Sequence, residues 1–544
     1  MKSKSVIGLC LSFSLAPFFG CTQVLAIEEN SVHGDKALLA ALPITAAPMT
    51  KLTLPPVERE PAPNIEPLKN FDIYGEVLKR INQRLKAKVT PGDLLERGRI
   101  YALKSDFASA IKDLTKAISM KKDLDDAYKL RGYCYSSMNK EKEAEQDYVT
   151  YLQHKPKEVP IWIALGACYD KDRQPQKAIE AFNHAIALTP KEATFYAFKA
   201  DVYGRSNQFD KANAAVDEGL KVDPNSRTCL FERAFIKELR KDKDGALKDL
   251  DALIAQYPDF IQARKERATI YEDQAKYQKA LEEYNDLIDL VTASAAKMVD
   301  GAVKKAEQRD LFGGAMAVSA ALAFYPEKVF FLRKRSEAYR LLRKYDEAME
   351  DADNAVTLAP SNPLGFMQRG YVEFSMERVD DSIKDFNKVL ELDPEEDTAN
   401  WGRGFAYCLK GDYKNAAADF DRYGNSPTVD MYVKYCFVYR ALMLKLCSQD
   451  SELPALYEKA GKKLDHKEWP YPFLEYLSGK ITEEELTKTA DNNDKQTELH
   501  CFLALNAMAS KNQTRAKDEF RWVLDNGNKD FFEYTLSTAL IKKL

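Results

Sequence analysis

Residues 156–190 read PKEVPIWIALGACYDKDRQPQKAIEAFNHAIALTP, a stretch that begins and ends with prolines 34 positions apart. Further prolines keep the same spacing, and a threonine fills the one slot without a proline. The slots hold Pro156, Pro190, Pro224, Pro258, Thr292, Pro326, Pro360 and Pro394. Only 23 of the 544 residues are proline, so this phasing indicates an internal repeat of 34 residues.

Three other columns follow the same period. The first column holds only small residues: Gly98, Gly132, Gly166, Ala200, Ala234, Ala268, Ala302, Ser336, Gly370 and Gly404. The second is mostly tyrosine: Tyr101, Tyr135, Tyr169, Tyr203, Lys237, Tyr271, Lys305, Tyr339, Glu373 and Tyr407. The third is mostly alanine: Ala110, Ala144, Ala178, Ala212, Ala246, Ala280, Gly314, Ala348, Ser382 and Ala416. Small side chains at fixed positions allow neighbouring helices to approach closely, which predicts stacked helical hairpins.

This pattern resembles the tetratricopeptide repeat family. The third repeat carries it most fully, with Trp162, Leu165, Gly166, Tyr169, Ala178, Phe182, Ala185 and Pro190. The resemblance implies an all-α fold, a right-handed superhelix of about eleven helix-turn-helix repeats. It also implies that each repeat ends at its proline, which lacks an amide hydrogen and interrupts the second helix.

Ten repeats run in register over 91–430, and the seventh, 295–328, is degenerate because its tyrosine column holds Lys305 and it contains Gly313-Gly314. A helical stripe at 67–90 predicts an N-terminal capping helix. Residues 431–496 predict an irregular helical segment, interrupted by Trp469-Pro470-Tyr471-Pro472. Residues 497–544 predict a final repeat and a closing helix. The C-terminal part, roughly the last hundred residues with the Trp-Pro-x-Pro break and the final repeat, is also similar to bacterial periplasmic tetratricopeptide lipoproteins that act as adaptors.

The N-terminus predicts export. Lys2 and Lys4 precede an apolar run over 6–19, which is too short to span a bilayer, and a cut after Ala26 would remove residues 1–26 as a signal peptide. An alternative is a lipoprotein leader, because the residues before Cys21 are similar to a bacterial lipobox and would make Cys21 the lipid-bearing first residue. Residues 27–66 are proline-rich and predict a disordered linker.

Several functional classes are disfavoured. The net charge of −4 provides no basic field that would recruit nucleic acid. The nine cysteines form no CxxC pair, and the five histidines show no metal-ligand spacing. No phosphate loop or nucleophile–base set is recognisable, so we expect no enzyme activity, no cofactor and no metal. The membrane would be reached only through a lipid anchor at Cys21.

The family resemblance places the inner wall of the superhelix on the first helix of each repeat. The Lys/Asn pair with which related co-chaperones grip a C-terminal carboxylate is absent from these positions. Instead, the last two regular repeats gather five large apolar residues, the aromatic cluster: Met367, Tyr371, Phe374, Trp401 and Phe405. Aromatic side chains on such a wall could anchor a partner peptide. Alternatively, they could pack inside the chain against 431–496.

The sequence therefore predicts a non-catalytic scaffold or adaptor of the bacterial cell envelope that binds protein or peptide partners. Two alternatives stay open. The chain could be a cytoplasmic scaffold whose first residues only imitate a leader, or an enzyme that uses the irregular C-terminal region. Fractionation and hydrolase screening would distinguish them. The sequence does not identify the partners or the oligomeric state.

Overall fold

The third repeat shows how the sequence forms each hairpin. Helices α8 (Val159–Lys171) and α9 (Pro175–Leu188) each carry a proline in the first turn, where the missing amide hydrogen costs no intrahelical bond. Helix α8 ends where Arg173 adopts a left-handed conformation, φ 58°, and the amide of Gln174 donates to the carbonyl of Tyr169. That bond satisfies a carbonyl left open at the helix end.

The structure is a computed structural model that describes residues 73–307, 311–425 and 432–544. Every regular element in these ranges is a helix. Before the degenerate repeat they are α3 (Ile73–Ala87), α4 (Pro91–Leu103), α5 (Phe107–Met120), α6 (Asp125–Ser137), α7 (Glu141–His154), α8, α9, α10 (Ala193–Arg205), α11 (Phe209–Val222), α12 (Arg227–Leu239), α13 (Lys243–Gln256) and α14 (Ile261–Asp273).

Two long helices follow, α15 (Tyr277–Glu307) and α16 (Leu311–Leu341). The later helices are α17 (Tyr345–Leu358), α18 (Pro363–Ser375), α19 (Val379–Leu392), α20 (Thr398–Lys410), α21 (Tyr413–Gly424), α22 (Val433–Leu446), α23 (Leu453–Lys463), α24 (Tyr471–Leu477), α25 (Glu483–Thr487), α26 (Asn493–Ala509), α27 (Gln513–Asn526) and α28 (Phe532–Leu540), with short 3₁₀ turns at Asp450–Glu452 and Ile541–Lys543.

Three of the sequence-based expectations lie outside the described residues. These are the leader 1–26 with Cys21, the linker 27–66 and the first six residues of the expected capping helix. The rest of that capping segment forms α3, which packs on α4 through the buried side chains of Ile81 and Leu85.

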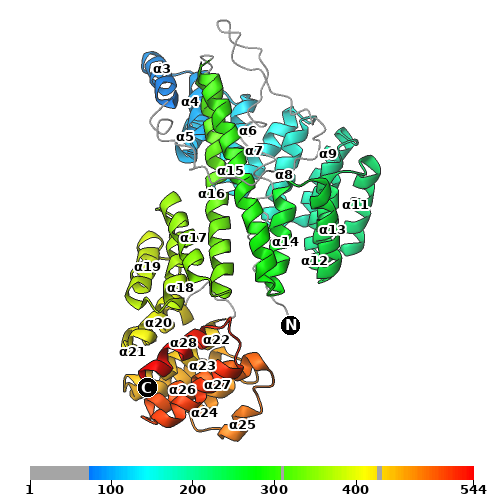
Figure 1. Cartoon of the computed structure of the whole chain (residues 1–544). Coiled ribbons are helices and arrows are strands. Elements are labelled where there is room, and N and C mark those ends of the chain that lie inside the picture. Colours follow the sequence, from blue (N-terminus) through cyan, green and yellow to red (C-terminus); the bar gives the residue numbers. More distant parts are fainter. Residues whose placement is uncertain (1–72, 308–310, 426–431) are drawn as a thin grey trace. The chain divides into compact units, whose positions relative to one another are not determined.

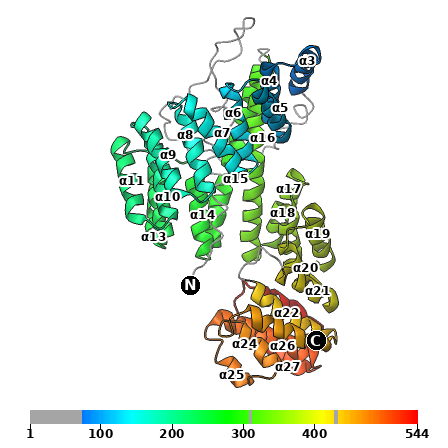
Figure 2. The same ribbon diagram turned by 180° about the vertical axis from the view of Figure 1, so that it is seen from behind.

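The chain divides into two units, each of which is a solenoid of helical hairpins. The first unit comprises the described residues up to Ile270 together with Asp289–Phe324, and the second comprises Tyr271–Ile288 and Tyr325–Leu544. In the first unit the hairpins from α8 to α13 stack in chain order (Figure 2). In the second unit α28 returns to lie against α20 and the final hairpin α26–α27 (Figure 1).

The small-residue columns are packed as predicted. The alanine-column residues Ala110, Ala144, Ala178, Ala212, Ala246, Ala280, Ala348 and Ala416 are all fully buried. A Cβ atom added at Gly166 would lie 2.4 Å from Cε1 of Phe182, and one added at Gly132 would lie 2.8 Å from Cε1 of Tyr148. The absence of a side chain at these glycines therefore allows the first helix of a repeat to contact the second.

Substitution of Gly166 by alanine should destabilise the first unit. The new methyl group would overlap the buried ring of Phe182. Overpacking of this kind costs about 1–3 kcal/mol, which exceeds the gain of roughly 1 kcal/mol from the helix propensity of alanine. We expect a lower urea midpoint by circular dichroism. Gly92→Ala is the matched control, because its Cβ would meet nothing within 4 Å, and a loss of equal size in both variants would contradict the explanation.

The degenerate seventh repeat differs from the expectation of a separate hairpin. Helix α15 runs through Thr292 without interruption, and α16 runs through Pro326. Thr292 retains the amide that proline would lack, and the residues after it favour helix. Pro326 removes one intrahelical bond, yet α16 continues through it. The residues after the proline do not explain this difference, because Glu327-Lys328 resembles Lys157-Glu158 and Lys191-Glu192, which follow helix ends.

Two further positions of the repeat carry side chains that link the two helices of most regular repeats. These positions were not identified from the sequence. An arginine of the first helix forms an ion pair with an aspartate 16 residues later in the second. The pairs are Arg97–Asp113, Arg131–Asp147, Arg233–Asp249, Arg335–Asp351, Arg369–Asp385 and Arg403–Asp419. In the third repeat the same positions hold Leu165 and Ala181, so both partners are replaced together.

Candidate functional site

The aromatic cluster comes from the first helices of the ninth and tenth repeats. Helix α18 carries Met367, Tyr371 and Phe374, and α20 carries Trp401 and Phe405. The ring centroids of Phe374 and Phe405 lie 6.2 Å apart, and those of Trp401 and Phe405 lie 4.8 Å apart. Stacking of the two repeats thus brings these residues together as the column spacing predicts. Met367 packs in the adjoining group around Phe386.

The C-terminal helix α28 covers this cluster. The ring of Phe532 stacks on that of Phe405, with centroids 5.0 Å apart and planes 5° apart. The same ring lies 5.7 Å from Tyr371 and 5.9 Å from Phe374. Phe532 therefore occupies the inner surface of both repeats.

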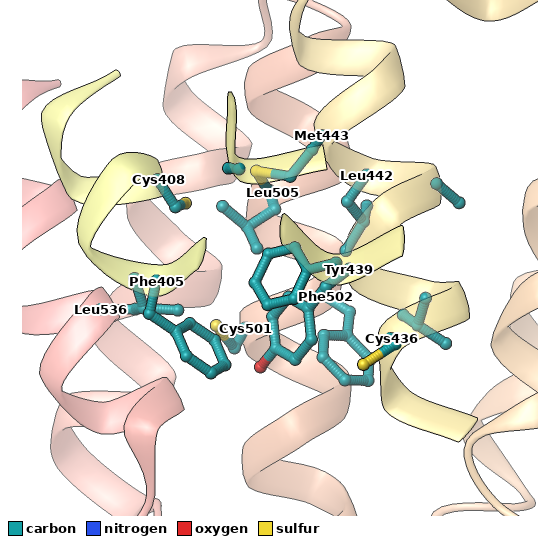
Figure 3. Close-up of a cluster of buried hydrophobic side chains, with 14 of the residues drawn as sticks. Phe405, Cys408, Cys436, Tyr439, Leu442, Met443, Cys501, Phe502, Leu505 and Leu536 are labelled. Carbon is teal, nitrogen blue, oxygen red and sulfur yellow. The ribbon is translucent and has the colours of Figure 1, made fainter. Parts of the chain in front are cut away.

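Helix α22 closes the cluster from another side. The ring of Tyr439 lies 4.8 Å from Phe405 and 5.8 Å from Trp401. Figure 3 shows Phe405, Tyr439, Phe502 and Leu536 converging in one apolar core. These residues come from α20, α22, α26 and α28, so the core joins the last regular repeat to the C-terminal helices.

The cluster is consequently interior. Phe405 is 0% exposed, Phe374 1%, Met367 7% and Trp401 8%. Of the two alternatives that the sequence left open, the structure shows packing within the chain. The expected covering segment, 431–496, contributes Tyr439, whereas Phe532 lies in the closing helix, outside that segment. The sequence signal for its role is the pair Phe531-Phe532 at the start of the expected closing helix.

Two buried carboxylates lie at the contact of α28 with the helices beneath it, Glu533 on α28 and Glu498 on α26. The hydroxyl of Tyr439 donates to the carboxylate of Glu533, and the indole nitrogen of Trp469 donates to that of Glu498. Burial, with a contribution from Glu533, raises the pKa of Glu498 to about 8. Burial also raises the pKa of Glu533. The core under α28 therefore favours the protonated forms of both acids.

Each unit contains a carboxylate of a first helix that is held by an arginine of the same helix. In the second unit Glu337 accepts two hydrogen bonds from Arg340, at 2.8 and 2.6 Å, and one of 3.2 Å from Gln368. These partners outweigh burial and lower the pKa of Glu337 to about 2. In the first unit Asp201 accepts bonds of 2.9 and 2.6 Å from Arg205. Both ion pairs lie within one helix, and the bond from Gln368 of α18 to Glu337 of α16 joins two neighbouring repeats.

Within the described residues, no group of three or more His, Cys, Asp and Glu side chains could hold a metal ion. The seven cysteines that the structure describes form no disulfide with one another. Across the same ranges, no helix combines the length and apolar character needed to cross a membrane.

Glu373 provides a test of the buried electrostatics. It stands in the tyrosine column, is 8% exposed, and burial together with Asp385 raises its pKa to about 8. The pKa of this carboxyl is higher in the folded than in the unfolded protein. The stabilisation that its protonated form contributes below about pH 4.5 is therefore lost as the pH rises towards 8. Glu373→Gln should therefore stabilise the second unit by about 1–3 kcal/mol at pH 8.5 and change little at pH 4.5.

The measurement is urea unfolding at both pH values. Glu350→Gln is the matched control, because Glu350 is exposed on the neighbouring helix α17. A gain at pH 4.5 as large as that at pH 8.5 would show that the ionised carboxylate is not the destabilising group.

The sequence pattern described as "Tetratricopeptide repeat" matches residues 159–192 in one form and residues 199–259, 238–295 and 367–430 in another. These segments are tetratricopeptide repeats. They include the two helices that carry most of the aromatic cluster. Such repeats are typically non-catalytic, and they support a role as a protein-interaction scaffold.

Proteins with similar tetratricopeptide repeats share only part of this chain. The small glutamine-rich tetratricopeptide repeat-containing protein 2 of Saccharomyces cerevisiae is 24% identical over 96 residues, which are 18% of this chain and 25% of the relative. The RNA polymerase II-associated protein 3 of Rattus norvegicus is 36% identical over 61 residues, or 11% of this chain and 9% of the relative. This chain thus matches a quarter or less of the length of these relatives.

Among solved structures, a tetratricopeptide repeat protein from Parabacteroides merdae matches 45% of this chain and 97% of its own chain. The sequence identity is 19% and the TM-score is 0.32.

Proposed function

We propose that this chain is a non-catalytic scaffold of the bacterial cell envelope that holds protein or peptide partners on the inner face of its repeats. The observation that supports this proposal is the array of hairpins in 34-residue register. Within each unit the regular hairpins contact their neighbours and present the first helices of successive repeats. Extended surfaces of this kind are what solenoid proteins use for binding.

The first unit provides the inner positions that are open to a partner. Thr269 on α14 is exposed, and Tyr133 on α6 is half-buried with its ring 6.3 Å from that of Phe107. An exposed polar position and a rigid aromatic ring on one wall suit an extended peptide, because the ring supplies contact area and polar groups set the register.

A site-specific photo-crosslinker tests this proposal. It replaces Thr269 on the inner face in one variant and Lys248, exposed on α13, in a control variant. Both full-length proteins are irradiated in cells of the source organism, and the cross-linked proteins are identified by mass spectrometry. The proposal predicts a defined protein adduct from position 269 and none at that mass from position 248. Identical adducts from both positions, or none from 269, would refute inner-face binding.

The envelope location rests on the N-terminal sequence, with its basic residues, apolar run and alternative processing sites at Cys21 and Ala26. Cell fractionation followed by mass measurement of the mature N-terminus distinguishes the outcomes. A lipid-modified Cys21 identifies a lipoprotein, and a chain beginning at Ile27 identifies a soluble exported protein. Recovery of the uncut chain from the cytoplasm would exclude export.

A further inference from the structure

The C-terminal segment lies where a bound peptide would lie. Phe532 contacts Tyr371 and Phe405, which occupy equivalent inner positions of the ninth and tenth repeats, and its ring lies 6.5 Å from that of Trp401. Phe532 itself is half-buried. One aromatic side chain from the end of the chain thus fills the groove between two repeats as an anchor residue would.

The remaining contacts of this segment follow the array. The guanidinium of Arg343 lies 4.4 Å from the ring centroid of Tyr534. Lys542 forms an ion pair with Glu377, and Lys543 donates to the carbonyl of Leu409. Arg343 and Glu377 are the left-handed residues of the turns in the eighth and ninth repeats, and Leu409 is near the end of α20. The segment therefore crosses three successive repeats, as a ligand of a repeat array does.

Docking of α28 also carries a cost. Its Glu533 is buried, and the groups that face it are Tyr435 and Tyr439 from α22 and Glu498 and Cys501 from α26. All of these are acidic or phenolic groups or thiols. A buried acid without a cationic partner opposes burial of the helix that carries it. The apolar contacts of α28, the hydrogen bond from Tyr439 and the ion pair of Lys542 with Glu377 therefore hold the segment against the cost of burying Glu533.

We propose that the aromatic inner surface of the ninth and tenth repeats, formed by Tyr371, Phe374, Trp401 and Phe405, is a binding site for an amphipathic helix of a partner protein, and that α28 is its built-in competitor. The partner helix presents an aromatic anchor followed by an apolar face and a basic C-terminal end, because α28 has this pattern. The inference rests on the proposed scaffold function and names the site and its regulation.

A fluorescent peptide of residues 529–544 serves as the probe, with the full-length protein as receptor. Binding to the unchanged protein should be weak, because α28 already occupies the site. Phe532→Ala in the receptor weakens the competitor and should raise the affinity for the peptide at least tenfold. The matched control is Thr535→Ala on the same helix, which should leave the affinity unchanged. A peptide that lacks its own Phe532 ring should bind neither receptor.

Equal peptide affinity of the Phe532→Ala and unchanged receptors, with unaltered circular dichroism, would overturn the proposal. If Phe532→Ala fails to fold, amide hydrogen exchange of the unchanged protein tests the proposal instead. Amides of α28 that exchange faster than those of α26, and faster still with excess peptide, support the proposal. Exchange of both helices at one rate overturns it. Neither experiment involves position 269. Failure of this competitor proposal can therefore be distinguished from failure of the proposed inner-face binding in the first unit.

Discussion

Replacement of Phe405 by alanine is expected to lower the free energy of unfolding of the second unit by about 3–5 kcal/mol. The ring is fully buried and contacts the rings of Trp401, Phe420, Tyr439 and Phe532. Its removal leaves a cavity at the junction of α20, α22 and α28, so the loss includes both transfer free energy and cavity formation. Urea unfolding followed by tryptophan fluorescence reports it, because three of the four tryptophans, Trp401, Trp469 and Trp522, lie in this unit.

Tyr432→Ala provides a comparison for which we expect a smaller loss of stability than for Phe405→Ala. The ring of Tyr432 lies 5.7 Å from that of Trp401, but the residue is 45% exposed. Its removal should cost about 1 kcal/mol, as for a partly exposed aromatic pair. An unchanged urea midpoint for Phe405→Ala would mean that the ring is not part of the core and would restore the interpretation of the aromatic cluster as an open groove.

Replacement of Arg403 by leucine should cost a similar 3–5 kcal/mol, because it leaves the carboxylate of Asp419 buried without its main partner. Arg403 donates to both carboxylate oxygens of Asp419, each at 2.7 Å, and to Asn387 at 2.6 Å. The remaining donor to Asp419 is Arg422 at 3.2 Å, on an exposed side chain. A thermal or urea unfolding curve of the single variant measures the loss.

The double variant Arg403→Leu with Asp419→Ala copies the third repeat, where Leu165 and Ala181 take these two positions and are buried. We expect it to recover most of the stability lost in the single variant, since no charge remains buried. The interaction energy from the double-mutant cycle is the decisive quantity. Losses of the two single variants that simply add in the double variant would show that the pair is not coupled.

Much of the fold could be predicted from the sequence because each repeat is a local structure. The residues that form a hairpin and its turn lie within 34 positions, and their neighbours repeat the same pattern. Gly166 and Ala178 therefore indicate, from the sequence alone, where the helices of neighbouring elements pack closely. The length of α15 and α16 could not be predicted in the same way, because the repeat phase suggested breaks at Thr292 and Pro326, and both helices continue through these positions.

The repeat phase predicts that the aromatic cluster comes together, and the expected covering segment 431–496 contributes Tyr439, but the second covering residue, Phe532, was not predicted. The repeat phase places Tyr371 beside Phe405 whatever else the chain contains. The covering residue, Phe532, comes from a segment without the repeat pattern, and its position depends on contacts between residues far apart in sequence, such as Tyr439 with Glu533, 94 residues later. No periodic signal encodes such a contact. The arginine–aspartate columns, in contrast, are visible in the sequence at a constant offset.

Zero-length cross-linking of the full-length protein tests the position of the C-terminal segment most directly. A carbodiimide joins a lysine to a carboxylate only when the two are in contact, and Lys542 forms an ion pair with Glu377. Lys434 and Glu468, 2.6 Å apart in the same unit, provide the internal positive control. We predict that tryptic mass spectrometry recovers both cross-linked pairs from the monomer. Recovery of the Lys434–Glu468 pair without the Lys542–Glu377 pair would contradict the docking of the C-terminal helix on the repeats.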